Sequence, residues 1–180
     1  MKPTLVLAIF VLTVTASLAS FSEPITLTED ERSWEAEHMV WGYPGTEELI
    51  YTEHFIISHN NWLREPNWAC YHLTAEDLMN GVARFKGNFQ TEESLEDYQT
   101  ATHYDYTRSG FDRGHMAPSG DMRKTKERDK STFRTSNIVP QTPSLNQGSW
   151  ATLEGDIRAL CEDKGELYVI TGPVYLKPAC

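Results

Sequence analysis

Four consecutive residues, Asp112-Arg113-Gly114-His115, constrain this chain more than any other feature of its sequence. They place a histidine, whose imidazole titrates near neutral pH, beside an arginine, whose planar guanidinium matches a phosphate group. Gly114 tolerates backbone conformations that a residue with a Cβ resists, so we expect a turn that aims the His115 imidazole outward. The motif predicts a proton acceptor next to an anion-binding cation, although a lone histidine is more often structural.

Two later segments carry amides and a carboxylate in a fixed order. Ser-Asn-Ile-Val-Pro-Gln contains Asn137, and Leu-Asn-Gln-Gly-Ser-Trp, followed closely by Leu-Glu, contains Asn146 and Glu154. Together with the Asp-Arg-Gly-His motif, these segments resemble the DNA/RNA non-specific endonucleases of the ββα-metal class, a family that includes mitochondrial endonuclease G and secreted nucleases. The resemblance runs from about residue 41 to residue 173.

The resemblance implies an α+β fold, in which a central antiparallel sheet carries packed helices and a ββα-metal catalytic unit. It also implies a metal-dependent enzyme that cleaves DNA and RNA to give 5′-phosphates. Little sequence preference is expected, because contacts to phosphate carry no base information. In this family pattern His115 matches the general base, and Asn146 matches the one direct protein ligand of a hydrated Mg²⁺, for which Mn²⁺ is an alternative. Glu154 would hold the metal's waters, whereas Asn146 could instead cap its helix.

Three arginines match family positions that contact phosphate. Arg113 belongs to the motif, Arg84 matches a second family arginine, and Arg158 would steer the phosphate from one turn after Glu154. Arg158 has a purely structural alternative, which is an i,i+4 ion pair with Glu154. Asn137 matches a family asparagine of the catalytic region, but a strand-end amide that satisfies the local backbone is an equal alternative.

The distribution of charge bears on nucleic-acid binding. The net charge of −10 opposes it, because affinity for phosphates normally comes from Lys and Arg. However, residues 23–53 hold nine acidic residues and one basic residue, whereas residues 105–134 hold eight basic and five acidic residues. We therefore expect the basic part to surround the site, while residues 123–130 taken alone favour an ordinary solvated helix or loop.

The first residues read as an export signal. Residues 1–19 combine a positive start, a short apolar run and small residues near Ala19, which predicts a cleaved signal peptide and a secreted or periplasmic protein without stable membrane association. An uncleaved anchor is the alternative, but the apolar run is short of the roughly 20 residues that span a bilayer. We expect a flexible acidic leader over residues 20–38 and one endonuclease domain over residues 39–180.

Export would permit one disulfide among Cys70, Cys161 and Cys180, and the sequence leaves the pairing open.

Near the end, residues 167–171 form an almost continuous apolar run, which is typical of a strand covered on both faces. Few residues follow that could cover it, so we expect the 180-residue chain to be C-terminally incomplete and poorly soluble or marginally stable.

Hydrophobic periodicity predicts the main elements. The expected strands are residues 49–58, 68–73, 131–139 and 167–171. Thr74 and Asp77 predict a capped short helix. A longer helix is expected over residues 146–160, where four apolar residues recur at helical spacing. They are Trp150, Leu153, Ile157 and Leu160.

Two rival functions come from other classes. A catalytically silent nucleic-acid-binding protein would be favoured if His115 or Asn146 were replaced, and both are present. A secreted interaction protein could use the acidic surface of residues 23–53. Cleavage of a plasmid with and without EDTA separates both rivals from the endonuclease.

Overall fold

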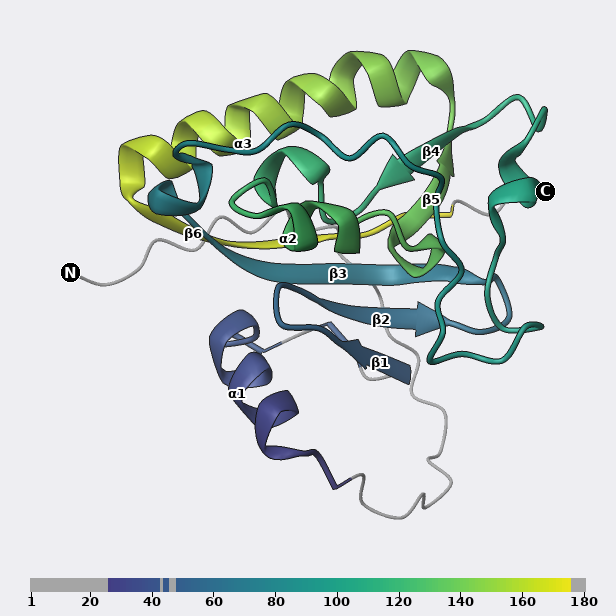
Figure 1. Cartoon of the computed structure of the whole chain (residues 1–180), viewed down its shortest axis with the longest axis horizontal. Helices are drawn as coiled ribbons and strands as arrows, with labels where there is room; N and C mark the ends of the chain where they lie inside the picture. Colours follow the sequence, from purple (N-terminus) through teal and green to yellow (C-terminus); the bar gives the residue numbers. More distant parts are fainter. Residues whose placement is uncertain (1–25, 43, 46–47, 176–180) are drawn as a thin grey trace.

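The computed structural model describes residues 26–42, 44–45 and 48–175 (Figure 1). The predicted signal peptide, residues 20–25 of the acidic leader and Cys180 lie outside the described residues. The helices are α1 (Glu29–His38), α2 (Lys126–Ser131) and α3 (Ala151–Lys164). The strands are β1 (Glu48–Tyr51), β2 (Ile56–Asn60), β3 (Glu65–Thr74), β4 (Asp112–His115), β5 (Ile138–Gln141) and β6 (Glu166–Thr171). Short 3-10 helices cover Ala75–Leu78, His103–Tyr106, Ser119–Asp121 and Thr135–Asn137.

Four strands form an antiparallel sheet in the order β1-β2-β3-β6. The long strand β3 lies inside this sheet and pairs with β2 so that Ser58 lies opposite Trp68. Strands β4 and β5 form a separate antiparallel pair. The prediction of an α+β fold built on an antiparallel sheet is confirmed, and so is a strand at residues 68–73, which extends further in both directions.

The larger sheet is covered on both faces (Figure 1). On one face, α3 and the β4–β5 pair enclose the main core, in which Tyr71, Leu73 and Leu167 are fully buried. On the other face, Met39 at the end of α1 packs on a smaller cluster that includes Trp68. Because neighbouring residues of a strand point to opposite faces, the alternate residues of β3 supply both cores. The β4–β5 pair and α3 are thereby held on the same side of a rigid sheet.

Residues 49–58 were predicted as one strand, and that prediction is wrong. They contain β1, a tight turn and β2, which pair with each other. Thr52 makes the turn, because its hydroxyl accepts from the backbone N–H of His54 and Phe55 and donates to the Phe55 carbonyl at 2.6 Å. Such local side-chain bonds compete with the strand ladder, and the β-branched character of Thr52 conceals them in the sequence.

Two further predictions are corrected. Residues 131–139 are not one strand, because α2 ends at Ser131 and a 3-10 helix intervenes before β5.

The acidic leader is helical over Glu29–His38, where Thr28 and Glu31 form a capping box. His38 is buried at the end of this helix, so α1 packs on the domain and does not form a flexible leader. The capping box of Thr74 and Asp77 is confirmed.

The predicted helix over residues 146–160 is present, but it is broken at Gly148. This residue has φ −109° and ψ −108°, a non-helical conformation inside the wide turn at Leu145–Trp150 that precedes α3. Trp150, Ile157 and Leu160 pack against the core as predicted, whereas Leu153 is 41% exposed. Glycine makes the break inexpensive, because it adopts backbone conformations that other residues resist.

Strand β6 is an edge strand of the described sheet, and its burial alternates. Leu167 and Val169 are buried and Tyr168 is half-buried, stacked on His72 with ring centroids 4.5 Å apart. The continuous apolar run therefore does not correspond to a strand fully covered on both faces.

Cys70 and Cys161 are buried free thiols, so they do not join each other. No helix within the described residues is long and apolar enough to span a membrane.

Candidate active site

The Asp-Arg-Gly-His motif forms strand β4. It pairs with β5 so that Gly114 lies opposite Val139 and His115 opposite Ile138. Gly114 belongs to this strand, and a Cβ on it would lie 2.2 Å from Cδ of Gln141. The predicted turn and outward imidazole are therefore wrong. The glycine makes room for Gln141, and His115 points inward with 7% of its surface exposed.

The imidazole of His115 lies against two phenylalanine rings. Its centroid is 5.0 Å from that of Phe133, edge to face, and 5.5 Å from that of Phe89. Burial and, to a smaller extent, the positive charge of Arg84 together lower the pKa of His115 to about 3. The buried Nε2 atom has no hydrogen-bond partner in the described part of the chain. The imidazole is therefore neutral and can accept a proton, as a general base must.

Two arginines lie on the same aromatic rings. Cζ of Arg84 is 5.3 Å from the centroid of Phe133, and Cζ of Arg113 is 5.5 Å from the centroid of Phe89. Within the residues that the structure describes, neither guanidinium forms an ion pair. Because no close ion pair in that part of the chain occupies either guanidinium, and both lie near a neutral imidazole, this arrangement suits the binding of an anion such as a phosphodiester.

Glu154, on the first turn of α3, belongs to the same electrostatic environment. Its pKa is raised to about 7, mainly because burial disfavours the carboxylate and partly because of the negative charge of Asp121. The positive charges of Arg158 and Arg84 oppose this rise. Because Arg84 also lowers the pKa of His115, the fold brings the predicted base, the predicted carboxylate and both of these arginines into one cluster.

Arg158 is anchored differently from the i,i+4 alternative. Among the described residues its ion pair is with Asp121, with Nη1 and Oδ1 2.8 Å apart, and not with Glu154. Asp121 is fully buried, and its Oδ2 accepts from the hydroxyl of Tyr71 at 2.7 Å. A Cβ on Gly120 would lie 2.6 Å from Nη1 of Arg158, so the glycine leaves a path for this guanidinium. Sequence reasoning missed Asp121, which gives no local signal of its partners.

Asn146 is joined to β4 through Asp112. Oδ2 of Asp112 accepts from Nδ2 of Asn146 at 3.0 Å and from Nε2 of Gln147 at 2.8 Å, and both bonds lower the pKa of Asp112. Because a carboxylate only accepts, the NH₂ group of Asn146 faces it and the amide oxygen remains for a cation. Asn146 lies inside the first turn, so the N-cap alternative does not hold. Sequence reasoning assigned Asp112 no role, although its place in the motif was a signal.

The amide oxygen of Asn146 fits a hydrated magnesium ion, which prefers oxygen ligands and keeps several waters. Among the described residues, no three His, Cys, Asp or Glu side chains are grouped so that they could hold a metal. No hydrogen bond links Asn146 directly to Glu154 in that part of the chain; Asn146 bonds to Asp112. The division between one amide ligand and a separate carboxylate stays a prediction.

Asn137 lies behind the site. It is fully buried, and its Oδ1 accepts from the backbone N–H of Ala117 at 2.8 Å. Its Nδ2 donates to the carbonyls of Ala117 and Thr132 at 2.9 and 3.0 Å. This placement favours the alternative in which the amide satisfies the local backbone. The role left for Asn137 is to support the segment that follows His115.

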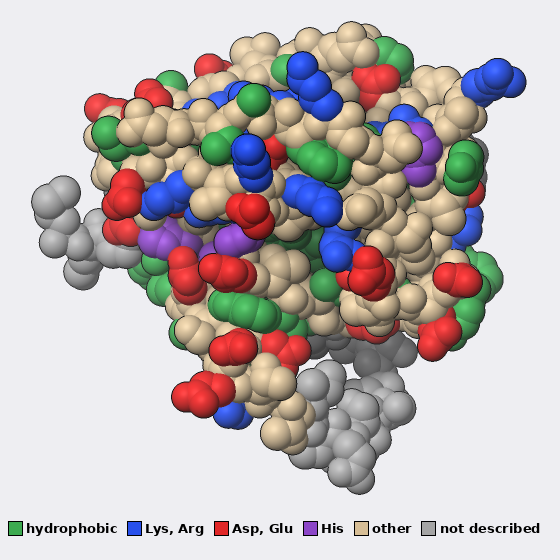
Figure 2. Space-filling model, viewed as in Figure 1, with side chains coloured by type: hydrophobic (Ala, Val, Ile, Leu, Met, Phe, Trp, Pro, Cys, Tyr) green, Lys and Arg blue, Asp and Glu red, His purple; other side chains and the backbone are tan. Residues whose placement is uncertain are grey.

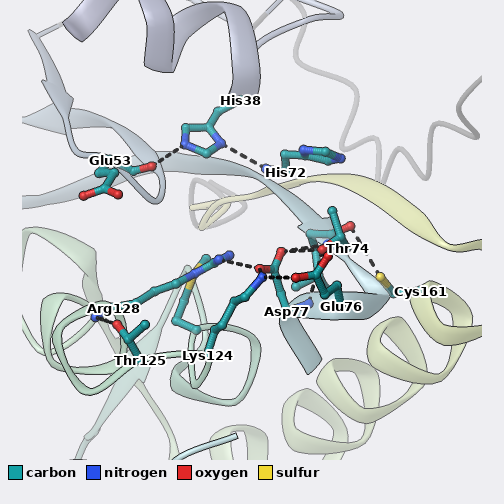
Figure 3. A network of polar contacts seen from close by, with 12 residues as sticks. His38, Glu53, His72, Thr74, Glu76, Asp77, Lys124, Thr125, Arg128 and Cys161 are labelled. Carbon is teal, nitrogen blue, oxygen red and sulfur yellow. Dashed lines mark hydrogen bonds and ion pairs between the residues drawn. The ribbon is translucent and has the colours of Figure 1, made fainter. Parts of the chain in front are cut away.

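A second polar cluster lies between α1, the turn after β1 and α2 (Figure 3). It surrounds a cavity of about 240 Å³. Nη1 of Arg128 lies 2.7 Å from Oδ1 of Asp77, and Nζ of Lys124 lies 2.8 Å from Oε1 of Glu76. The lining residues are Glu37, His38, Glu53, His54, Asp77, Lys124, Thr125 and Arg128.

These ion pairs correct the expectation that the whole basic part of the sequence surrounds the site. Lys124 and Arg128 are neutralised at the second cavity. Figure 2 shows Lys and Arg side chains above the sheet and Asp and Glu side chains on and around α1. On this face Asp and Glu side chains also lie among the Lys and Arg side chains of the upper part, and only some of the cations are available to an anion.

Comparison of the chain with known proteins shows the family to which it belongs. The family model described as DNA/RNA non-specific endonuclease matches residues 35–179. The chain therefore belongs to the DNA/RNA non-specific endonuclease family, as the motifs predicted.

Individual relatives agree with this membership. Nuclease C1 of Cunninghamella echinulata var. echinulata is 39% identical over 140 residues, which cover 76% of this chain and 56% of that protein. Mitochondrial endonuclease G of Homo sapiens is 35% identical over 136 residues, which cover 76% of this chain and 46% of that protein. The crystal structure of an EndoG/EndoGI complex matches with a TM-score of 0.75 and 35% identity, over 84% of this chain and 62% of that chain. The chain spans about half the length of the curated relatives it matches.

Proposed function

We propose that this protein is a metal-dependent endonuclease that hydrolyses phosphodiester bonds of DNA and RNA with little sequence preference. The observation that carries the proposal is the neutral imidazole of His115, held between Phe89 and Phe133 beside two arginines that form no ion pair within the described residues. Membership of the DNA/RNA non-specific endonuclease family supports the same substrate class.

In the proposed reaction, Arg84 and Arg113 bind the phosphodiester and His115 activates the attacking water. Nε2 of His115 takes a proton from the water as its oxygen bonds to phosphorus. The bond from phosphorus to the 3′-oxygen breaks, and this oxygen takes a proton from solvent. The products carry a 5′-phosphate and a 3′-hydroxyl. Because the charge of Arg84 lowers the pKa of His115, a phosphate bound to Arg84 would raise the basicity of the imidazole. The base thus becomes stronger when substrate is present.

A divalent ion, Mg²⁺ with Mn²⁺ as the alternative, would neutralise charge on the phosphoryl and leaving oxygens when bound. The amide oxygen of Asn146 would hold the ion, and Asp112 would orient that amide. Glu154 would accept hydrogen bonds from waters of the ion. Burial raises its pKa to about 7, while the positive charges of Arg158 and Arg84 partly oppose this rise. Arg158, held by Asp121, would steer the phosphate from the α3 side.

Nicking of a supercoiled plasmid tests the proposal. The purified chain is incubated with plasmid and Mg²⁺, with and without excess EDTA, and RNA is tested in parallel. We expect nicking and then linearisation that EDTA abolishes, and degradation of RNA under the same conditions. Binding of plasmid without cleavage would favour the silent nucleic-acid-binding protein, and neither binding nor cleavage would favour the interaction protein with an acidic surface.

We further propose that the protein is exported and is secreted or periplasmic. The support is the sequence of residues 1–19, which lie outside the described residues. N-terminal sequencing of protein recovered outside the cytoplasm should begin near Ser20. An exported sample that begins at Met1 would contradict cleavage.

A further inference from the structure

We propose that residues 103–111 form a base-stacking platform, on which Tyr104 and Phe111 bind unpaired bases of single-stranded nucleic acid next to the reacting phosphate. The inference rests on the proposed function and names the substrate form that the site favours. It depends on the rigidity of this segment, its attachment to Arg113 and the exposure of its two rings.

The segment is held in one conformation by bonds at its start, middle and end. Oδ2 of Asp105 accepts from the backbone N–H of Thr102 at 2.7 Å. Tyr106 is buried, and its hydroxyl donates to the Ile138 carbonyl of β5 at 3.2 Å. The Ser109 hydroxyl donates to the Tyr106 carbonyl at 2.9 Å. A platform ordered in advance loses little conformational entropy when a base binds.

The segment is also attached to the arginine that we assign to phosphate binding. Nη2 of Arg113 donates to the His103 carbonyl at 2.8 Å and to Oγ1 of Thr107 at 3.3 Å. Cζ of Arg113 lies 5.6 Å from the ring centroid of Tyr106. The arginine and the segment therefore form one unit, and a base on the segment would belong to a nucleotide close to the phosphate on Arg113.

Two aromatic rings of this unit face solvent. Tyr104 is 82% exposed, and its only described ring contact is edge to face with His103 at 5.8 Å. Phe111 is 47% exposed and directly precedes Asp112, which holds Asn146. Tyr104 directly follows His103, whose carbonyl binds Arg113, and Phe111 directly precedes the residue that binds the predicted metal ligand.

The chemistry of these groups selects a single strand. An aromatic ring stacks on the face of a base, and this contact is sequence-tolerant because every base has such a face. Bases of a duplex are already stacked on one another, so they are not available without unpairing. Arg113 supplies the charge for the phosphate between stacked bases, which is the usual arrangement in single-strand binding.

The test measures binding by fluorescence anisotropy in EDTA, so that no cleavage occurs. The probes are a labelled 12-nucleotide single strand, an abasic oligomer of the same length, and the matching duplex. The variants are Tyr104→Ala, Phe111→Ala and the double variant. Trp41→Ala is the control, because Trp41 is 52% exposed and follows α1, which lies on the other face of the larger sheet from the β4–β5 pair (Figure 1). Thermal unfolding confirms that each variant folds.

We expect the double variant to bind the single strand roughly tenfold or more weakly, from the usual worth of a base stacked on an aromatic ring. Binding of the abasic oligomer and the duplex should not change, and Trp41→Ala should resemble wild type. Three results would each overturn the platform. The double variant could lose affinity equally for all three probes, or lose none for the single strand. The wild-type protein could also bind the single strand and the abasic oligomer with equal affinity. Cleavage with Mg²⁺ is assayed separately, so a chain that stacks bases but never cleaves would contradict the proposed function alone.

Discussion

Two clusters of this molecule contain the same kinds of side chains but balance their charges differently. At the cavity between α1 and α2, Arg128 pairs with Asp77 and Lys124 pairs with Glu76. Around His115, Arg84 and Arg113 lie over aromatic rings and form no ion pair within the described residues. The first arrangement joins two parts of the fold, because its charges are satisfied internally. The second leaves positive charge for a ligand, which is why we assign the active site there.

The largest expected effect separates the histidines of the two clusters. His115→Ala should reduce the cleavage rate by about 10² to 10⁴, the usual contribution of a positioned general base. His54→Ala, at the second cavity, should leave the rate unchanged. Steady-state cleavage of a labelled oligonucleotide measures both. Because His115 is buried, thermal unfolding must show that both variants are folded. Equal losses of cleavage rate in the two folded variants would contradict the placement of the active site around His115.

The metal site gives the next effect. Asn146→Ala should raise the Mg²⁺ concentration for half-maximal activity most, because it removes the amide oxygen. Asp112→Ala should raise it by about 10- to 100-fold, the range for a residue that orients a metal ligand. Gln147→Ala, which removes the other donor to Asp112, is the control and should change it little. A normal Mg²⁺ titration for Asn146→Ala would exclude it as the ligand.

Two buried aspartates test whether Arg158 serves the site. Asp121→Ala and Asp77→Ala each leave an arginine without its partner, and each should lower the free energy of unfolding by about 2 kcal/mol. This is less than for a fully buried pair, because both arginines keep some solvent contact. Only Asp121→Ala should also lower kcat/KM, since only Arg158 lies near Glu154. Equal activities in the two variants would make Arg158 structural.

The smallest effect concerns pH and the second cavity. Nδ1 of His38 accepts from the backbone N–H of His72, and Nε2 donates to the Glu53 carbonyl, so the imidazole is neutral. Burial is the main cause that lowers the pKa of His38, while the charges of Arg128 and His72 also lower it and that of Glu37 raises it.

The unfolded chain therefore binds this proton at a higher pH than the folded chain. The free energy of unfolding should fall as pH drops from about 6.5 towards the folded pKa. His38→Gln, which can keep one donor and one acceptor, should weaken this dependence. Urea unfolding at several pH values measures it, and an unchanged pH dependence in the variant would show that other groups cause the loss.

The sequence identified which residues lie together better than it predicted how they are oriented. His115, Arg84 and Glu154 were identified from short motifs, and the structure brings them into one cluster. The orientation of His115 was predicted wrongly, because the reason for Gly114 is the side chain of Gln141 on another strand. A contact between strands leaves no trace in the local sequence.

Long-range anchors could not be predicted for the same reason. Asp121, Tyr71 and Arg158 form one bonded group but are at least 37 residues apart in sequence. The hairpin turn at Thr52 was missed because a β-branched residue favours a strand while its hydroxyl forms the turn. By contrast, α3 and the capping box of Thr74 were predictable, since their causes lie within a few residues.

The central claim is that the unpaired arginines, and not the paired cations, contact the phosphate backbone. The most direct test is the salt dependence of single-strand binding in EDTA for two double variants that remove equal charge. Arg84→Gln with Arg113→Gln should reduce the slope of log affinity against log salt by about one for each arginine. Lys124→Gln with Arg128→Gln should leave the slope unchanged. Equal slopes for the two double variants, or a loss confined to Lys124 and Arg128, would contradict the account.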